Sequence, residues 1–161
     1  MSRFTTRQLA AAGLIAALYA VMSYFSGIFG IAFGLVQCRF SEALCLLPWL
    51  MPEAVPGLFV GCLIANLLSP YGALDILFGS LATLLAALWT ARIRRRALAA
   101  VPPVVCNGLI VGALVTFYEV GFSPAFPAVF AYNAATIALG EALACGVLGS
   151  LVLKLAIQLK K

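Results

Sequence analysis

Residues 35–53 read LVQCRFSEALCLLPWLMPE, and they place two charged side chains inside an otherwise apolar run. Arg39 and Glu42 lie three positions apart, so a helix through this run would carry them as neighbours on one face. Each charge at the centre of a membrane helix costs roughly 2.5–3.5 kcal/mol. A helix that carries this cost turns the pair away from lipid, toward a polar cavity or a partner charge. The pair is therefore a hypothesis for a functional site.

The composition around this stretch belongs to a membrane protein. The chain has 161 residues, of which 65% are hydrophobic and only 9% are charged. Soluble domains are about 45–50% apolar and about 25% charged. Lipid cannot bond to free backbone groups, so only helices or a closed barrel can cross it. The apolar runs are continuous and do not alternate, which predicts an all-α integral membrane protein with one transmembrane domain over residues 1–161.

The apolar runs predict six transmembrane helices, because one crossing takes about 20 residues. We expect them over residues 8–26, 35–51, 54–68, 73–91, 102–118 and 129–158. The first run is too long for a cleaved signal peptide and is expected to stay as a helix. The glycine-punctuated connection at 26–34 has the backbone freedom of a mobile lid, although a plain interfacial loop would look much the same.

The positive charge is distributed as in a multi-pass membrane protein, and not as in a nucleic-acid-binding one. Nine of the ten Lys and Arg residues fall in three clusters, at residues 3–7, 92–96 and 154–161, and the tenth is Arg39. Lys and Arg concentrate in the cytoplasmic loops of membrane proteins. Six crossings with both termini cytoplasmic place all three clusters on the cytoplasmic side.

A stripe of small residues runs along the first predicted helix. Ala12, Ala16 and Ala20 follow one another at four-residue spacing, which lets another helix approach closely. The partner helix could belong to this chain or to another subunit. The residues alone favour packing inside the chain.

Two further acids lie within predicted spans. Asp75 falls in the first turn of its helix, where a capping role and a ligand role are equally plausible. Glu141 lies near the middle of the last span, too far from either end for the helix dipole to explain it. With Arg39 and Glu42 they form a set in which acids outnumber bases. Because buried carboxylates must be paired, such a pocket favours a ligand with several donors or a positive charge.

The sequence offers little for catalysis. It has no His, and its five Cys residues lie in apolar runs without C-x-x-C spacing, which predicts small buried side chains. It contains no P-loop, no G-x-S-x-G, no H-E-x-x-H and no metal-ligand cluster. We therefore expect no enzyme activity, no catalytic residue, no metal and no cofactor in this chain.

Residues 36–87 closely resemble the queuosine-precursor transporter (QueT) family, whose members are substrate-binding subunits (S components) of energy-coupling-factor (ECF) transporters. The resemblance rests on R-x-S-E-A-L at 39–44, P-x-x-x-P-G-L-F at 52–59, N-L-L at 66–68 and L-D-I-x-F-G-S-L-A-T at 74–83. It continues through P-P-V-V-x-N-x-L-I-V-G at 102–112 and the Gly-Glu pair at 140–141.

The resemblance implies a six-helix S-component bundle in the plasma membrane of a prokaryote. It implies as partners a transmembrane coupling subunit and two cytoplasmic ATPases, which would use the ATP. In such subunits the stripe at Ala12, Ala16 and Ala20 docks the coupling subunit, which reverses the preference stated above. The implied substrate is a 7-deazaguanine, chiefly 7-aminomethyl-7-deazaguanine.

This ligand fits the charges in the sequence. A carboxylate can accept two hydrogen bonds from a guanine-type edge, and a cationic aminomethyl group calls for a second carboxylate. We assign Glu141 and Asp75 to the two ends of the ligand, and Arg39 or Asn107 to its carbonyl oxygen. Arg39 would partly neutralise Glu42.

Three alternatives stay open. The ligand could be another vitamin-like molecule taken up by the same class of importer. The chain could be a small proton-coupled secondary transporter, with Glu141 or Glu42 carrying the proton. A membrane enzyme is a third class, which turnover by the purified chain would support.

Overall fold

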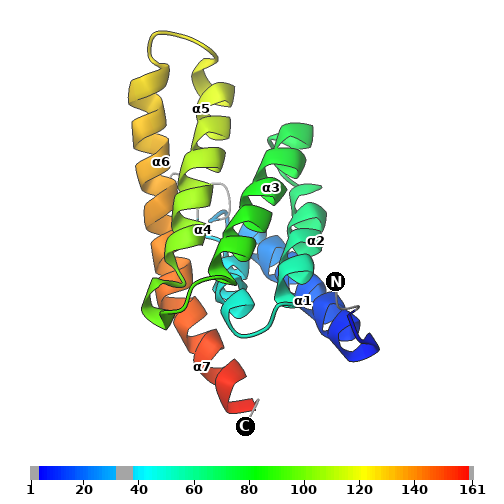
Figure 1. Cartoon of the computed structure of the whole chain (residues 1–161). Coiled ribbons are helices and arrows are strands. Elements are labelled where there is room, and N and C mark those ends of the chain that lie inside the picture. Colours follow the sequence, from blue (N-terminus) through cyan, green and yellow to red (C-terminus); the bar gives the residue numbers. More distant parts are fainter. Residues whose placement is uncertain (1–3, 32–37, 160–161) are drawn as a thin grey trace.

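The structure, a computed structural model, describes residues 4–31 and 38–159 and contains no strand within those ranges (Figure 1). Four of its helical stretches are long and apolar enough to cross a membrane: Thr6–Ile28, Gly72–Thr90, Arg96–Val120 and Phe126–Leu159. A shorter apolar helix covers Ala54–Asn66. The predicted all-α membrane bundle is confirmed. Six crossings and two cytoplasmic termini stay predictions.

The first three α-helices form one half of the bundle. Helix α1, Thr6–Ile28, begins with a capping box in which Thr5 and Gln8 bond to each other's backbone. Helix α2 covers Ala54–Asn66 and helix α3 covers Gly72–Thr90. Gly72 starts α3 with φ +62°, a backbone conformation that residues with a Cβ rarely adopt.

The other half consists of two long helices, each interrupted by a π-helical turn. Helix α4, Val101–Cys106, continues through the turn η3, Asn107–Val111, into α5, Gly112–Val120. Helix α4 is preceded by the short 3-10 turn η2, Arg96–Leu98. Helix α6, Phe126–Leu143, continues through η4, Ala144–Gly149, into α7, Ser150–Leu159. Turns of this kind inside α-helices occur frequently at functional sites.

The segment predicted as a transmembrane helix over residues 35–51 has a different form. Within the described residues it is a ten-residue 3-10 helix, η1, Phe40–Trp49. A 3-10 helix rises about 2.0 Å per residue, so η1 covers about 20 Å of a hydrocarbon layer about 30 Å thick. Residues 32–37, which include part of this segment and of the lid predicted at 26–34, lie outside the described residues.

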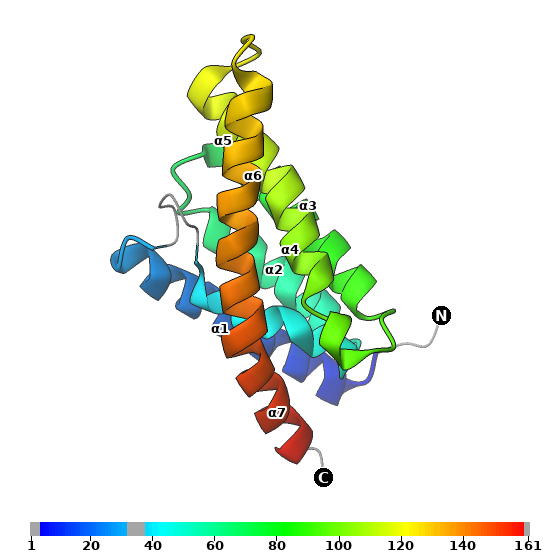
Figure 2. The same ribbon diagram turned by 90° about the vertical axis from the view of Figure 1, so that its left-hand side faces the viewer.

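The segment η1 lies at the centre of the molecule. Residues 41–48 are all buried, and η1 packs against α1, α2, α3, η4 and α7. Figures 1 and 2 show it in cyan, with helices around it in both views. A tight ten-residue helix surrounded on all sides positions the polar groups that it carries with little freedom.

Helices α1 and α2 run in the same direction and touch closely. A Cβ on Gly57 would lie 2.7 Å from the carbonyl oxygen of Ala12, and one on Gly61 would lie 2.8 Å from that of Ala16. Residue numbers increase in the same direction along both helices from the first contact pair to the second, so α1 and α2 are parallel. The segment that connects them must therefore run in the opposite direction, and η1 is part of that segment. The alternation of direction agrees with the predicted order of crossings.

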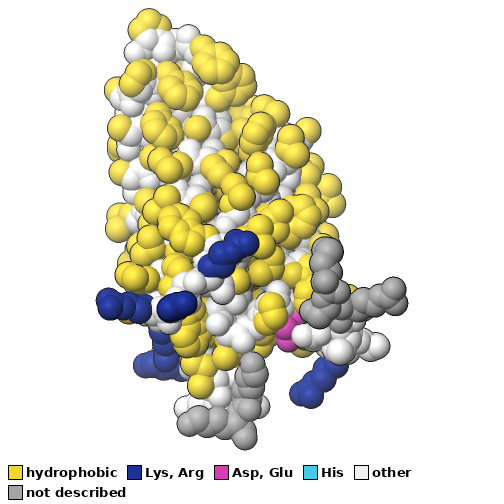
Figure 3. All heavy atoms as spheres, viewed as in Figure 1, with side chains coloured by type: hydrophobic (Ala, Val, Ile, Leu, Met, Phe, Trp, Pro, Cys, Tyr) yellow, Lys and Arg dark blue, Asp and Glu magenta, His cyan; other side chains and the backbone are white. Residues whose placement is uncertain are grey.

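The surface separates apolar from cationic side chains. Figure 3 shows hydrophobic side chains over the upper part of the face and Lys and Arg side chains only in its lower half. The turn between α3 and α4 lies at this same lower end in Figure 1, where the C-terminus also lies. This arrangement is the one expected when positive charge is kept on one side of a membrane. Three residues of the basic clusters, Arg3, Lys160 and Lys161, lie outside the described residues.

Candidate substrate-binding site

Arg39 reaches from the start of η1 to the adjoining ends of α2 and α3. Its guanidinium donates to the Asn66 side-chain oxygen at 3.2 Å and lies 3.8 Å from the Asp75 carboxylate. Arg39 thus forms an ion pair with Asp75, a residue 36 positions away in the sequence. Arg39 precedes η1 as its N-cap residue in an extended conformation.

Asp75 belongs to the first turn of α3, as predicted, but its carboxylate is directed into the bundle. A Cβ on Gly79, one turn further along α3, would lie 2.5 Å from Asp75 Oδ1. The other oxygen, Oδ2, is buried and makes no hydrogen bond, although it faces Arg39. Asp75 itself is 1% exposed. This position favours a role in the polar site over a capping role.

Sequence reasoning missed Asn66, the last residue of α2. Its side-chain amide donates to the backbone carbonyl of Asp75 at 3.0 Å, while its oxygen accepts from Arg39. Asn66 is 1% exposed, so these bonds replace its contacts with water. In the sequence it is part of the N-L-L turn, and nothing there distinguishes it from an ordinary turn residue.

Glu42 lies deeper, among groups that donate to it. Tyr19, which is fully buried on α1, donates through its hydroxyl to one carboxylate oxygen, and the Cys45 thiol donates to the other. Tyr19 was also missed, because an aromatic residue in an apolar helix is ordinarily a core residue. Its hydroxyl group makes it part of the polar site.

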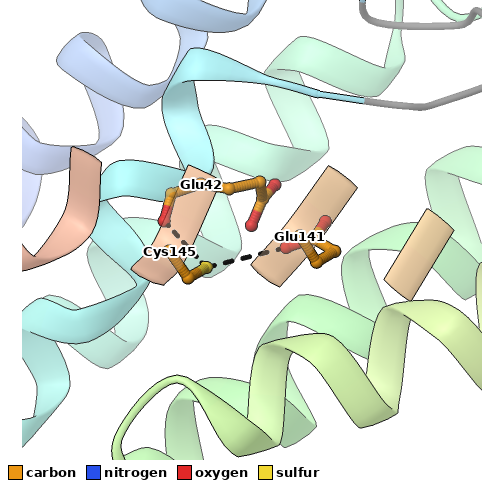
Figure 4. A group of neighbouring side chains, drawn as sticks. All are labelled: Glu42, Glu141 and Cys145. Atoms are coloured by element: carbon orange, nitrogen blue, oxygen red, sulfur yellow. Dashed lines mark hydrogen bonds between the residues drawn. The ribbon is translucent and has the colours of Figure 1, made fainter. Parts of the chain in front are cut away.

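Glu141 faces Glu42 from the opposite half of the bundle. Asn107, at the start of the π turn η3, donates to Glu141 at 2.9 Å. Cys145, four residues after Glu141, donates to the Glu42 carbonyl at 3.3 Å and lies 3.7 Å from Glu141 Oε2. Figure 4 shows the hydrogen bonds of the Cys145 sulfur to the Glu42 backbone carbonyl and to the Glu141 carboxylate.

The charges of this site do not balance. Among the residues that the structure describes, the site contains three buried carboxylates, those of Glu42, Asp75 and Glu141, and one guanidinium, that of Arg39. Ligand atoms of Glu42, Glu141 and Cys145 all lie within 4.8 Å of one another. Such an arrangement favours a shared proton or a cation between the carboxylates, because two buried like charges repel strongly. A ligand amine or a metal ion could each supply the charge.

Two cavities border these residues. The inner one, of about 10 Å³, is lined by Arg39, Glu42, Asn107 and Glu141, with further residues of α3, η3 and α6 completing it. The outer one, of about 510 Å³, lies between the C-terminal ends of α1 and α2, and its polar residues include Ser23, Arg39 and Asn66. It lies far from the basic cluster at 92–96, at the end of the bundle expected to face outward.

The small residues of α1 have partners inside the chain. Ala12 and Ala16 contact Gly57 and Gly61 of α2, and Ala16 is buried there. Ala20 is partly buried. Packing within the chain thus accounts for Ala12 and Ala16. Docking of a coupling subunit by the same stripe stays a prediction.

Together the fold and the site define a class: a multi-pass helical membrane protein with a small, acidic polar site buried between the two halves of its bundle. A family profile described as QueT transporter matches residues 9–158, and the chain belongs to that family. The family expected from the sequence motifs is therefore confirmed. Membership of a transporter family points away from an enzyme.

A stretch of 84 residues is 30% identical to the protein named queuosine precursor transporter QueT from Lactococcus lactis subsp. cremoris (strain MG1363). The match covers 52% of this chain and 49% of the relative, so the chain spans about half of the relative's length. No solved structure matches the chain.

Proposed function

We propose that this chain is the substrate-binding subunit of an ECF-type importer in a prokaryotic plasma membrane, and that its substrate is a queuosine precursor of the 7-deazaguanine class. The observation that carries the proposal is the surplus of buried carboxylates around one arginine, beside a cavity of about 510 Å³. Ligand pockets in proteins are about 300–1,000 Å³. The family match and the printed name of the relative support the choice of substrate.

The chemistry of 7-aminomethyl-7-deazaguanine matches the polar groups of the site. Its guanine-type edge donates to a carboxylate, and its ammonium group supplies the missing positive charge. We assign these contacts to Glu141 and Asp75, with Asn107 or Arg39 donating to the ligand carbonyl. Glu42, already bonded to Tyr19 and Cys45, would contribute charge.

Binding by the purified chain tests this proposal. In detergent, calorimetry should show saturable binding of 7-aminomethyl-7-deazaguanine by the wild type. Glu141→Gln and Asp75→Asn should each weaken it about tenfold or more, because each removes a charged acceptor worth about 1.5–3 kcal/mol. Glu119→Gln changes an exposed acid and should leave affinity unchanged. Wild-type affinity in both site variants would refute the assignment.

The substrate and the energy source can be tested separately. The analogue 7-cyano-7-deazaguanine lacks the ammonium group and should bind more weakly. Binding of an unrelated vitamin in its place would favour the alternative importer. The chain has no nucleotide-binding motif, so ATP would act through partner ATPases, which should be required for uptake in cells.

A proton-coupled secondary transporter is the second candidate, and the proximity of Glu42 and Glu141 favours it. Two adjacent buried carboxylates can share and transfer one proton. Uptake that continues without the ATPases but stops with a protonophore would establish this mechanism in place of the importer.

A further inference from the structure

The two cavities differ greatly in what they can hold. The inner one, of about 10 Å³, has room for about one water molecule. The outer one, of about 510 Å³, can accept a small organic ligand. Glu42, Asn107 and Glu141 line the inner cavity, whereas the outer cavity is lined by other residues. A ligand in the outer cavity is therefore separated from these groups in this conformation.

Arg39 lines both cavities. Its side chain extends from η1 to Asn66 on α2 and Asp75 on α3, and only 12% of that side chain is exposed. Asn66 is itself oriented by its bond to the Asp75 backbone, so its oxygen is fixed toward Arg39. The guanidinium group is thereby held between the two spaces.

We propose that Arg39 is a movable partition between an outer receiving chamber and the inner carboxylate pair, and that Asn66 and Asp75 hold it closed. A ligand first occupies the outer chamber and reaches Glu42 and Glu141 only when the guanidinium swings away from Asp75. A cationic ligand group would then take the place of the guanidinium among the carboxylates. Only the statement about the ligand rests on the proposed function; the partition itself does not.

Cys145 reports on access to the carboxylate pair of Glu42 and Glu141, with which it clusters. Its thiol lies against both glutamates and is fully buried. We would treat the wild-type chain in detergent with a cationic, membrane-impermeant methanethiosulfonate and follow each cysteine by mass spectrometry. Cys106, half-buried on α4, serves as the internal control, because unlike Cys145 it is not part of the cluster with Glu42 and Glu141.

Arg39→Ala should raise the labelling rate of Cys145 about tenfold or more while that of Cys106 stays constant. Asp75→Asn, which keeps the shape of the side chain and removes the ion pair, should raise the Cys145 rate in the same direction. Arg94→Ala removes an exposed arginine and should have no effect. An unchanged Cys145 rate in both Arg39→Ala and Asp75→Asn would overturn the proposal. So would an equal rise at Cys106, since Arg39 would then stabilise the whole bundle.

The ligand is added in a second series. If 7-aminomethyl-7-deazaguanine protects Cys145 in the wild type, the ligand reaches the inner chamber as proposed. If it protects Cys145 only in Arg39→Ala, the partition does not open for it and this part of the proposal fails. If it protects in neither, while Arg39→Ala still exposes Cys145, the choice of substrate is wrong and the partition stands.

Discussion

At the scale of single residues, the site depends on polar groups that satisfy buried charge. Tyr19 illustrates this, because its hydroxyl is one of the two side-chain donors to the Glu42 carboxylate. Tyr19→Phe keeps the ring and removes that donor, which should lower the free energy of unfolding by about 1–3 kcal/mol. Titration with a denaturing detergent measures the loss. Tyr24→Phe, at an exposed position on the same helix, should be neutral, and an equal loss there would contradict the explanation.

Gly79 gives a second test at this scale. A methyl group there would lie 2.5 Å from Asp75 Oδ1 and 2.8 Å from Asn66 Nδ2. Gly79→Ala should therefore displace the groups that hold Arg39, destabilise the chain by about 1–3 kcal/mol and weaken ligand binding. Thermal unfolding and calorimetry measure the two effects. Gly13→Ala, where nothing lies within 4 Å, should be neutral or stabilising by about 0.5–1 kcal/mol.

At the scale of elements, the close approach of α1 and α2 accompanies the placement of Tyr19 beside Glu42 and of Asn66 beside Arg39. Gly61→Ala would place a methyl group 2.8 Å from both the Ala16 carbonyl oxygen and Tyr19 Cβ. The two helices must then separate, and we expect a loss of about 1–3 kcal/mol in stability, measured by the same titration. Gly146→Ala meets nothing within 4 Å and is the matched control. A tolerated Gly61→Ala would show that this contact is not tightly packed.

The π turns belong to the same scale. Asn107 opens η3, and Cys145 lies inside η4. Asn107 donates to Glu141 on the neighbouring helix α6, and Cys145 donates to the backbone carbonyl of Glu42 in η1, so each turn carries a residue of the polar site. The sequence carries no signal for either turn, because α-helical periodicity continues on both sides.

At the scale of the whole molecule, the distribution of positive charge predicts the orientation in the membrane. A cysteine placed at Phe122, a 91% exposed position in the turn between α5 and α6, should react with an impermeant thiol reagent applied to intact cells. A cysteine placed at Arg94 should react only after the cells are permeabilised, because basic loops stay in the cytoplasm. Labelling of the Arg94→Cys variant in intact cells would contradict the predicted orientation.

Several features of this protein follow from the sequence without a structure. Composition predicts a membrane protein, because transfer of apolar side chains into lipid is a sum over residues, and the continuous apolar runs predict helices instead of barrel strands. The cost of a charge in lipid is equally local, so Arg39, Glu42, Asp75 and Glu141 could be identified as unusual from their positions in apolar runs. All four are largely buried in the structure. Their roles in binding stay predictions.

The contacts between the charged side chains were determined only by the tertiary structure. Arg39 forms an ion pair with Asp75, and Glu42 lies near Glu141 in the last long helix. Sequence spacing predicts contacts within a regular helix, but Arg39 precedes η1 as its extended N-cap residue, and its guanidinium contacts α2 and α3. Asn66 and Tyr19 became site residues for the same reason: the packing of α1, α2 and α3 brings them to Arg39 and Glu42, and long-range packing leaves no periodic signal in the sequence.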